Sequence, residues 1–262
     1  MTTKKKDILE TINHIKKIFP FSDSTDNDRE EYIDLKQNSH LNIAYNVCEY
    51  LKKGSTVLDF GSGPLDKTSI IKKLGYECYA IDDLADDWHL KDDNKSKIFQ
   101  FAKKLEIPLY SSIDELTLSH PGIKFDLILL NDVIEHLHNS PRFIFKELDK
   151  LLSDNGYYLI TVPNSTNLKK RVKLLFGKTN YVDYKSYFMH DGNYFRGHVR
   201  EYSKDCLIQL CKYMNYEIIK IKGCHQMLNK LPNFLILPWK FLTYFFSNLS
   251  DSYILIAKKL KK

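Results

Sequence analysis

The fold prediction rests on one stretch, Val57-Leu58-Asp59-Phe60-Gly61-Ser62-Gly63. An apolar run ends there in a carboxylate, and two glycines form the turn that follows. Glycine lacks a Cβ atom and tolerates positive φ, so the backbone of such a turn can approach a ligand closely. The helix expected after the turn offers unpaired N–H groups at its N-terminus. The stretch therefore predicts a strand, a ligand-binding turn and a helix, with Asp59 as the negative partner for an amino group of the ligand.

Apolar runs alternate with helix-like stretches around this turn. We predict strands at 56–60, 77–81, 125–130 and 157–162, and helices at 42–51, 67–74, 95–105 and 141–152. The alternation indicates a parallel sheet, and apolar residues at consecutive strand positions indicate helices on both faces. A helix at 204–214 and strands at 216–222 and 252–258 predict a hairpin-like pair at the end of the chain. The pattern is that of a doubly wound α/β fold.

Polar residues follow two other predicted strands. Asp82 lies about 20 residues after the glycines, where a carboxylate can accept the hydroxyl hydrogens of a ribose in nucleotide-binding α/β folds. Asn131 and Asp132 follow the strand at 125–130, at the carboxyl edge of the sheet where ligands bind in such folds. Together these residues predict a site for a ligand that contains adenosine.

These features resemble the motifs of class I S-adenosylmethionine-dependent methyltransferases. The glycine turn resembles the first motif of that family, Asp82 matches its acidic residue after the second strand, and 125–137 resembles its fourth-strand signature. The stretch 152–156 precedes the next strand as in family members, so the resemblance covers about 42–164, with a looser match from 203 onward. It implies a Rossmann-like α/β fold: a seven-stranded, mostly parallel sheet with helices on both faces, an antiparallel last strand and a helical or irregular cap.

The resemblance also implies a cofactor, S-adenosyl-L-methionine. The residues implied to bind it are Asp59, Gly61, Gly63, Asp82, Asp83, Leu84 and Asn131. One position departs from the family, because many members have a third glycine where this chain has Leu65, and close approach is restricted there. The main alternative is an NAD-dependent enzyme, but a dinucleotide fingerprint requires glycine where this chain has Asp66, whose carboxylate would repel a pyrophosphate.

Methyl transfer from a sulfonium is an in-line displacement, so the protein mainly aligns the reacting atoms and removes a proton where the acceptor is a hydroxyl. The candidate bases are His198, in a segment (195–203) that resembles one in small-molecule and glycan methyltransferases, and His136, in the fourth-strand motif. For both histidines, the alternative to a catalytic role is a structural one. The insertion at 83–93 holds aspartates and His89, but their spacing is not a recognised ligand pattern, so no catalytic metal is expected.

Cations and tyrosines are frequent between 165 and 202. They are Lys169, Lys170, Arg171, Lys173, Lys185, Arg196 and Arg200, with Tyr181, Tyr184, Tyr187 and Tyr194. Such cations can hold phosphate, and tyrosines can stack on sugars. We therefore expect O-methylation of a small molecule such as a sugar nucleotide, phosphorylated sugar or glycan, in carbohydrate biosynthesis. The alternatives are a non-catalytic S-adenosylmethionine-binding or scaffold protein and an RNA methyltransferase, although no recognisable nucleic-acid module accompanies the patch.

The 262 residues suit one domain with elaborations, and the net charge of +6 permits an anionic partner. We expect a helical extension at 1–39 and a methyltransferase domain at 40–262, with a cap insertion at about 165–202 and an apolar insertion at about 225–250. Five scattered cysteines and no signal-peptide pattern favour the cytoplasm. Two prolines and a lysine in 231–246 argue against a spanning helix. We expect this stretch to cover the core, with a dimer contact or peripheral membrane contact as alternatives.

Overall fold

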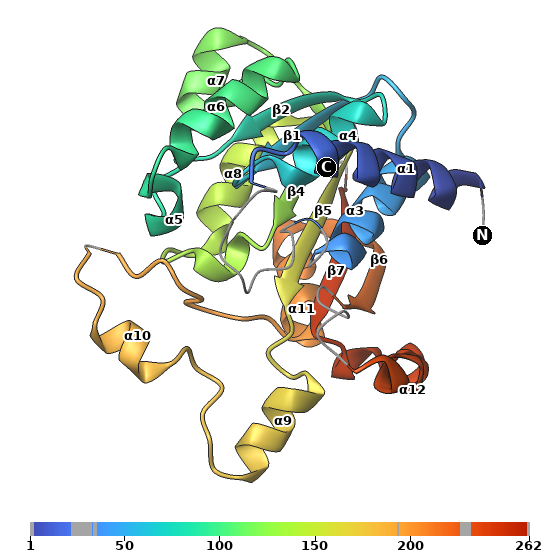
Figure 1. Cartoon of the computed structure of the whole chain (residues 1–262), viewed down its shortest axis with the longest axis vertical. Coiled ribbons are helices and arrows are strands. Elements are labelled where there is room, and N and C mark those ends of the chain that lie inside the picture. Colours follow the sequence, from blue (N-terminus) through green and yellow to red (C-terminus); the bar gives the residue numbers. More distant parts are fainter. Residues whose placement is uncertain (1–2, 22–32, 34–35, 193, 226–231, 261–262) are drawn as a thin grey trace.

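The computed structural model describes residues 3–21, 33, 36–192, 194–225 and 232–260. A seven-stranded sheet lies at its centre, in the order β3-β2-β1-β4-β5-β7-β6 (Figure 1). The strands are β1 Thr56–Phe60, β2 Glu77–Ile81, β3 Leu109–Tyr110, β4 Phe125–Asn131, β5 Leu152–Pro163, β6 Tyr216–Cys224 and β7 Ser252–Lys259. Strands β1 to β5 pair in parallel, whereas β7 is antiparallel to both β5 and β6. The predicted Rossmann-like sheet with an antiparallel last strand is confirmed.

Apolar side chains from both faces of the sheet are buried. Leu127 and Leu129 of β4 pack in one cluster with Val47, whereas Ile128 and Leu130 of the same strand pack on the other face with Leu148. Each of these side chains is at most 2% exposed. Burying one such side chain contributes about 1.5–3 kcal/mol, so the consecutive apolar run of β4 is explained by helices on both faces.

Helices cover this sheet, both near the predicted ranges 42–51, 67–74, 95–105, 141–152 and 204–214 and at other places. They are α1 Thr3–Ile18, α3 Gln37–Tyr50, α4 Asp66–Lys73, α5 Asp87–Leu90, α6 Asn94–Lys104, α7 Ile113–Ser119, α8 Pro141–Leu151 and α11 Lys204–Met214, with the short 3-10 helix η1 Ile134–His136. Along α1, Ile8, Ile12 and Ile15 recur at helical spacing and are at most 1% exposed. They pack in one cluster with Ile70 of α4 and Ala80 of β2, so α1 shares the core of the sheet.

The segment between β5 and α11 projects from this body. It contains α9 Leu168–Leu175 and α10 Tyr184–Phe188, neither of which has a buried residue. Figure 1 shows both helices standing away from the sheet and its covering helices. The segment returns to the body before α11, where the Ser203 side chain accepts a hydrogen bond from the Cys206 N–H and caps that helix. We refer to 165–202 as the cap.

The apolar stretch after β6 differs from its prediction. It forms α12 Asn233–Phe245, followed by the 3-10 helix η3 Ser247–Leu249. Phe234, Leu237, Phe241 and Tyr244 are each at least 68% exposed, so this helix does not serve mainly as a cover for the core. Parts of two expected segments, namely 22–32 and 34–35 of the N-terminal extension and 226–231 of the apolar insertion, lie outside the described residues.

Candidate functional site

The strand order creates a switch point beside β1. The chain runs outward from β1 through β2 to β3, then returns to β4 on the other side of β1. In open α/β sheets, ligands bind outside the carboxyl ends of the strands at such a point. A cavity of about 980 Å³ lies there, with a lining that includes residues at the carboxyl ends of β1, β2 and β4. These are Gly61, Ser62 and Gly63, then Asp82 and Asp83, then Asn131 and Asp132.

The glycine turn is held by β2 and by Asp82. The carbonyl of Ile81 accepts hydrogen bonds from the N–H groups of Gly61 and Ser62 at 2.8 and 3.2 Å. The Asp82 carboxylate accepts from the Gly63 N–H at 2.7 Å and from the Leu84 N–H at 2.8 Å. Asp82 therefore orders the turn, and since each carboxylate oxygen has a second lone pair, it keeps capacity for a ligand hydroxyl.

The turn also passes close to the loop after β4. Gly61 has φ +76°, and a Cβ atom built there would lie 2.5 Å from Cγ2 of Val133. Only glycine fits this position without displacement, because the backbone conformation and the contact both exclude a side chain. The sequence signal at residue 61 thus has a physical cause in the packing of two loops.

Two polar atoms at the cavity have no partner in the described part of the chain. They are Nδ2 of Asn131 and Oγ of Ser62, and both residues are 4% exposed. A buried donor without an acceptor is unfavourable by about 1–3 kcal/mol, so such atoms mark places where a ligand can supply the missing bond. Asn131 and Ser62 line the cavity on the sides of β4 and β1.

Two of the residues predicted to bind the cofactor lie outside the cavity lining. Among the described residues that line the cavity, neither Asp59 nor Leu84 appears. Asp59 is 1% exposed, and its carboxylate accepts a 2.6 Å hydrogen bond from the Thr68 hydroxyl. Burial raises the pKa of Asp59 to about 6. Leu84 is 1% exposed and shapes the loop after β2 through its N–H bond to Asp82.

The residues after the turn explain the departure from the glycine pattern. Leu65 has φ 66°, a left-handed conformation that favours glycine, and its side chain is fully buried in the cluster beneath α1. Asp66 is also fully buried, with its carboxylate 2.7 Å from Nε2 of His40 and 3.7 Å from Nζ of Lys67. Although burial acts in the opposite direction, the charge of Lys67 and the contact with His40 hold the pKa of Asp66 far below its usual range. Asp66 therefore carries a negative charge at the helix N-terminus, as the argument against NAD requires.

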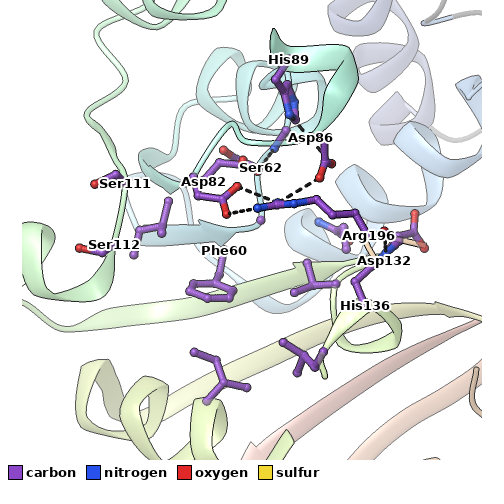
Figure 2. Close-up of a pocket in the computed structure, with 18 of the residues that line it drawn as sticks. Phe60, Ser62, Asp82, Asp86, His89, Ser111, Ser112, Asp132, His136 and Arg196 are labelled. Atoms are coloured by element: carbon purple, nitrogen blue, oxygen red, sulfur yellow. Dashed lines mark hydrogen bonds and ion pairs between the residues drawn. The ribbon is translucent and has the colours of Figure 1, made fainter. Parts of the chain in front are cut away.

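The cap closes over the cavity through Arg196. Its guanidinium lies 3.0 Å from one oxygen of Asp83 and 3.1 Å from Asp86. Figure 2 shows this side chain extending from the side of His136 towards Asp86. The carbonyl oxygens of Phe195 and Arg196 also lie 2.7 and 2.8 Å from ring nitrogens of His138 and His136. One short stretch of the cap thus spans the cavity between the loops that follow β2 and β4.

The two predicted bases lie next to each other. His136 lines the cavity, and its ring centroid is 5.0 Å from that of His198, in an edge-on arrangement. Burial and then the charge of His136 lower the pKa of His198, which favours the neutral imidazole. Glu135 lies beside them, fully buried, and burial raises its pKa to about 8. The fold therefore brings together His136 and His198 with an acidic group that sequence reasoning did not select.

Several lining residues were not predicted from the sequence. Lys36 and Lys67 bring cations to the cavity, and the stretch 111–114 follows the two-residue strand β3. Burial lowers the pKa of Lys36, because the charged form is desolvated. Trp88 and His89 also line the cavity, and His89 is 6% exposed. The lysines carry no motif of their own, so only the fold reveals them.

Comparisons with known proteins agree with this architecture. A family model described as a methyltransferase domain matches residues 30–221. The mitochondrial ubiquinone biosynthesis O-methyltransferase of Rattus norvegicus is 27% identical over 125 residues, which are 48% of this chain and 35% of that enzyme. The chain thus matches about a third of the length of this curated relative.

Solved structures share the fold at low sequence identity. A SAM-dependent methyltransferase from Archaeoglobus fulgidus has a TM-score of 0.51 and 18% identity, covering 87% of this chain and 98% of that one. A cyclopropane-fatty-acyl-phospholipid synthase-like protein from Lactobacillus casei has a TM-score of 0.61 and 12% identity, covering 96% of this chain and 99% of that one. With the family match over most of its length, the chain belongs to the class I S-adenosylmethionine-dependent methyltransferase family.

Proposed function

We propose that this protein transfers a methyl group from S-adenosyl-L-methionine to a hydroxyl oxygen of a small molecule. One observation carries the proposal: the strand-order switch point, the glycine turn and Nδ2 of Asn131, which has no partner among the described residues, surround one cavity of about 980 Å³. A cavity of this size accommodates a nucleoside together with a small acceptor. The O-methyltransferase named among the relatives supports oxygen as the acceptor atom.

The residues at the turn fit the cofactor. The Cβ position of Gly61 faces the side chain of Val133, whereas the space around Gly63 is open to at least 4 Å from a built Cβ and is free for a ligand. Asp82 can accept the ribose hydroxyls, while Nδ2 of Asn131 and Oγ of Ser62 can bond to polar atoms of the cofactor. Bound there, the cofactor supplies an electrophilic methyl group on a sulfonium, and the chain's own groups orient the acceptor oxygen in line with it.

The acceptor we propose carries hydroxyl and phosphate groups, as a sugar nucleotide, phosphorylated sugar or glycan does. Lys36, Lys67 and Arg196 place three cations on the cavity wall, each with acidic or other charged neighbours. Tyr194 adds an aromatic face from the cap. This combination supports a role in carbohydrate biosynthesis, because cations pair with phosphate and aromatic rings stack on sugars.

His136 and His198 promote removal of the acceptor's proton in this proposal. His136 lines the cavity, and the ring of His198 in the cap contacts the ring of His136. The O–CH3 bond forms as the S–CH3 bond breaks, the electron pair stays on sulfur, and the hydroxyl proton leaves to water beside these groups. Turnover that is unchanged in both His136→Ala and His198→Ala would exclude them.

A cytoplasmic location with peripheral membrane contact is the remaining part of the proposal. All five cysteines lie within the described ranges and are free thiols. Among the helices that the structure describes, none is long and apolar enough to cross a membrane. The exposed Phe234, Leu237 and Phe241 of α12 support either a dimer contact or, as we propose, contact with a lipid surface. Absence of binding in liposome flotation would exclude that contact.

Calorimetric titration with S-adenosylmethionine and S-adenosylhomocysteine, with NAD as the control ligand, tests the central claim. We expect micromolar binding, about −8 kcal/mol, that is lost in Asp82→Ala and kept in Asp87→Ala, an exposed carboxylate of the same loop. An acceptor screen of sugar nucleotides, phosphorylated sugars and hydroxylated aromatic compounds follows. Binding without turnover would favour the non-catalytic alternative, turnover on RNA would favour the RNA alternative, and no binding would favour a scaffold.

A further inference from the structure

Three side chains that can ligate a metal meet beside the cavity. Glu135 and His136 belong to η1, directly after β4, whereas His198 comes from the cap. One ligand atom from each of them lies within 4.8 Å of the other two. The N–H groups of Val199 and Arg200 donate to the carbonyl of Glu135 at 2.8 and 3.1 Å, which fixes His198 against η1. We call these three side chains the Glu-His-His cluster.

The carboxylate of this cluster is unusual. Glu135 is fully buried, and neither of its oxygens has a hydrogen-bond partner among the described residues. A buried carboxylate without a partner is strongly unfavourable, so it requires either a bound proton or a cation. A cation shared with the two imidazoles would neutralise the charge and fill the lone pairs of the carboxylate at the same time.

Each imidazole has an outer partner at Nδ1, which leaves Nε2 available for a metal. Nδ1 of His136 lies 2.8 Å from the carbonyl oxygen of Arg196, and Nδ1 of His198 lies 3.1 Å from the Glu201 carboxylate. Both partners only accept, so each Nδ1 carries the proton and each Nε2 keeps its lone pair. Metal-bound histidines show this pattern, in which an outer carbonyl or carboxylate fixes the ring. Lys170 in turn forms an ion pair with Glu201 and holds that carboxylate in place.

We propose that Glu135, His136 and His198 bind one divalent transition-metal ion, and that an oxygen of the methyl acceptor completes its coordination. Two imidazoles and one carboxylate are a ligand set that suits Zn²⁺ and also Mn²⁺ or Fe²⁺. Three protein ligands leave a position open, as in catalytic rather than structural sites. Because His136 lines the cavity, we place the open position on the acceptor's side.

This inference rests on the function proposed above, since it states how the acceptor hydroxyl becomes a nucleophile. A hydroxyl bound to a divalent cation loses its proton more readily, and the cation fixes its position for in-line attack. The sequence offers the aspartates and His89 at 83–93 as candidate ligands, and their spacing predicts no metal. The Glu-His-His cluster is assembled by the fold from η1 and the cap, so no local spacing reveals it.

The test uses the full chain, dialysed against a chelator and then titrated with Zn²⁺ by calorimetry. We expect one ion per chain, an affinity at least about 100-fold lower in His198→Ala, and a smaller loss of about 10-fold in Glu201→Gln. Neither variant removes a fully buried side chain, so both should fold. The matched control is His138→Ala, which removes a nearby histidine outside the cluster and should bind Zn²⁺ as the wild type does.

Two further readouts make every outcome informative. Substitution with Co²⁺ should give visible bands without thiolate charge transfer, whereas thiolate bands would overturn the assignment in favour of the cysteines. S-adenosylhomocysteine binding is measured on the same samples. If it persists while Zn²⁺ binds equally to the wild type and His198→Ala, or to neither, the metal site is wrong and the methyltransferase proposal stands. If Zn²⁺ depends on His198 but S-adenosylhomocysteine does not bind, the site is supported and the proposed function fails.

Discussion

Replacement of Gly61 by alanine is the sharpest test of the cofactor turn. The new Cβ would lie 2.5 Å from Cγ2 of Val133, at a residue with φ +76°. The left-handed conformation costs an L-residue roughly 1–2 kcal/mol, and overpacking costs roughly 1–3 kcal/mol. We therefore expect the free energy of unfolding to fall by about 2–5 kcal/mol, and Tm to fall by roughly 10 °C.

The matched control is Gly122→Ala. Gly122 has φ +79°, but a Cβ built there meets nothing within 4 Å, so only the conformational cost of roughly 1–2 kcal/mol remains. Urea unfolding of both variants isolates the contact with Val133. Because the turn at Gly61 must also shift, S-adenosylhomocysteine affinity should fall at least about tenfold in Gly61→Ala alone, which corresponds to about 1.4 kcal/mol. Equal stability of the two variants, together with wild-type affinity in Gly61→Ala, would refute the reasoning.

Three other predictions concern single side chains of the site. Asp59→Asn should remove a pH dependence: burial raises the pKa of Asp59 in the folded state from 3.8 to about 6, so its contribution is full below about pH 4 and is lost as the pH rises through about 6. In urea unfolding between pH 4 and 8 without cofactor, Asp59→Asn should be more stable than the wild type above pH 7, by up to about 3 kcal/mol. The same dependence of the unfolding free energy on pH in both proteins would contradict this. Arg196→Ala should weaken cofactor binding by roughly three- to tenfold and change stability by less than about 1 kcal/mol, since the side chain is 45% exposed; an equal effect of Arg200→Ala would contradict a specific role. Asn131→Leu should lower cofactor affinity about tenfold, because it removes the unpartnered amide donor, and calorimetry that shows unchanged affinity would exclude that contact.

The sequence predicted those elements whose pattern follows from burial. The bounds of β1, β2 and α11 agree with the prediction, because each carries a continuous apolar run or a periodic face that ends at a turn or cap. Strand β3 was missed, since two residues are too few for a period. Helix α12 was also missed, because its stretch is apolar at most positions and contains a proline at 238, a residue that usually breaks a helix. Periodicity is informative only where an element is long and one face differs from the other.

In the candidate site, too, some residues could be predicted from the sequence and others could not. Gly61, Gly63 and Asp82 could be selected from the sequence because a turn that closely approaches a ligand requires those residue types in that order. Lys36 and Lys67 could not, since each is an ordinary lysine until the fold turns it towards the cavity. The structure also locates Asp59 behind the turn, where Thr68 binds it. Sequence therefore indicates residues that shape the backbone better than residues that reach the site through tertiary packing.

The cap links the two halves of this site. Arg196 binds Asp83 and Asp86 beside the proposed cofactor position, and His198, only two residues later, completes the Glu-His-His cluster beside the proposed acceptor position. A segment this short cannot move at one end without moving at the other. The contact with the loop after β2 and the Glu-His-His cluster therefore both depend on one short stretch of the cap.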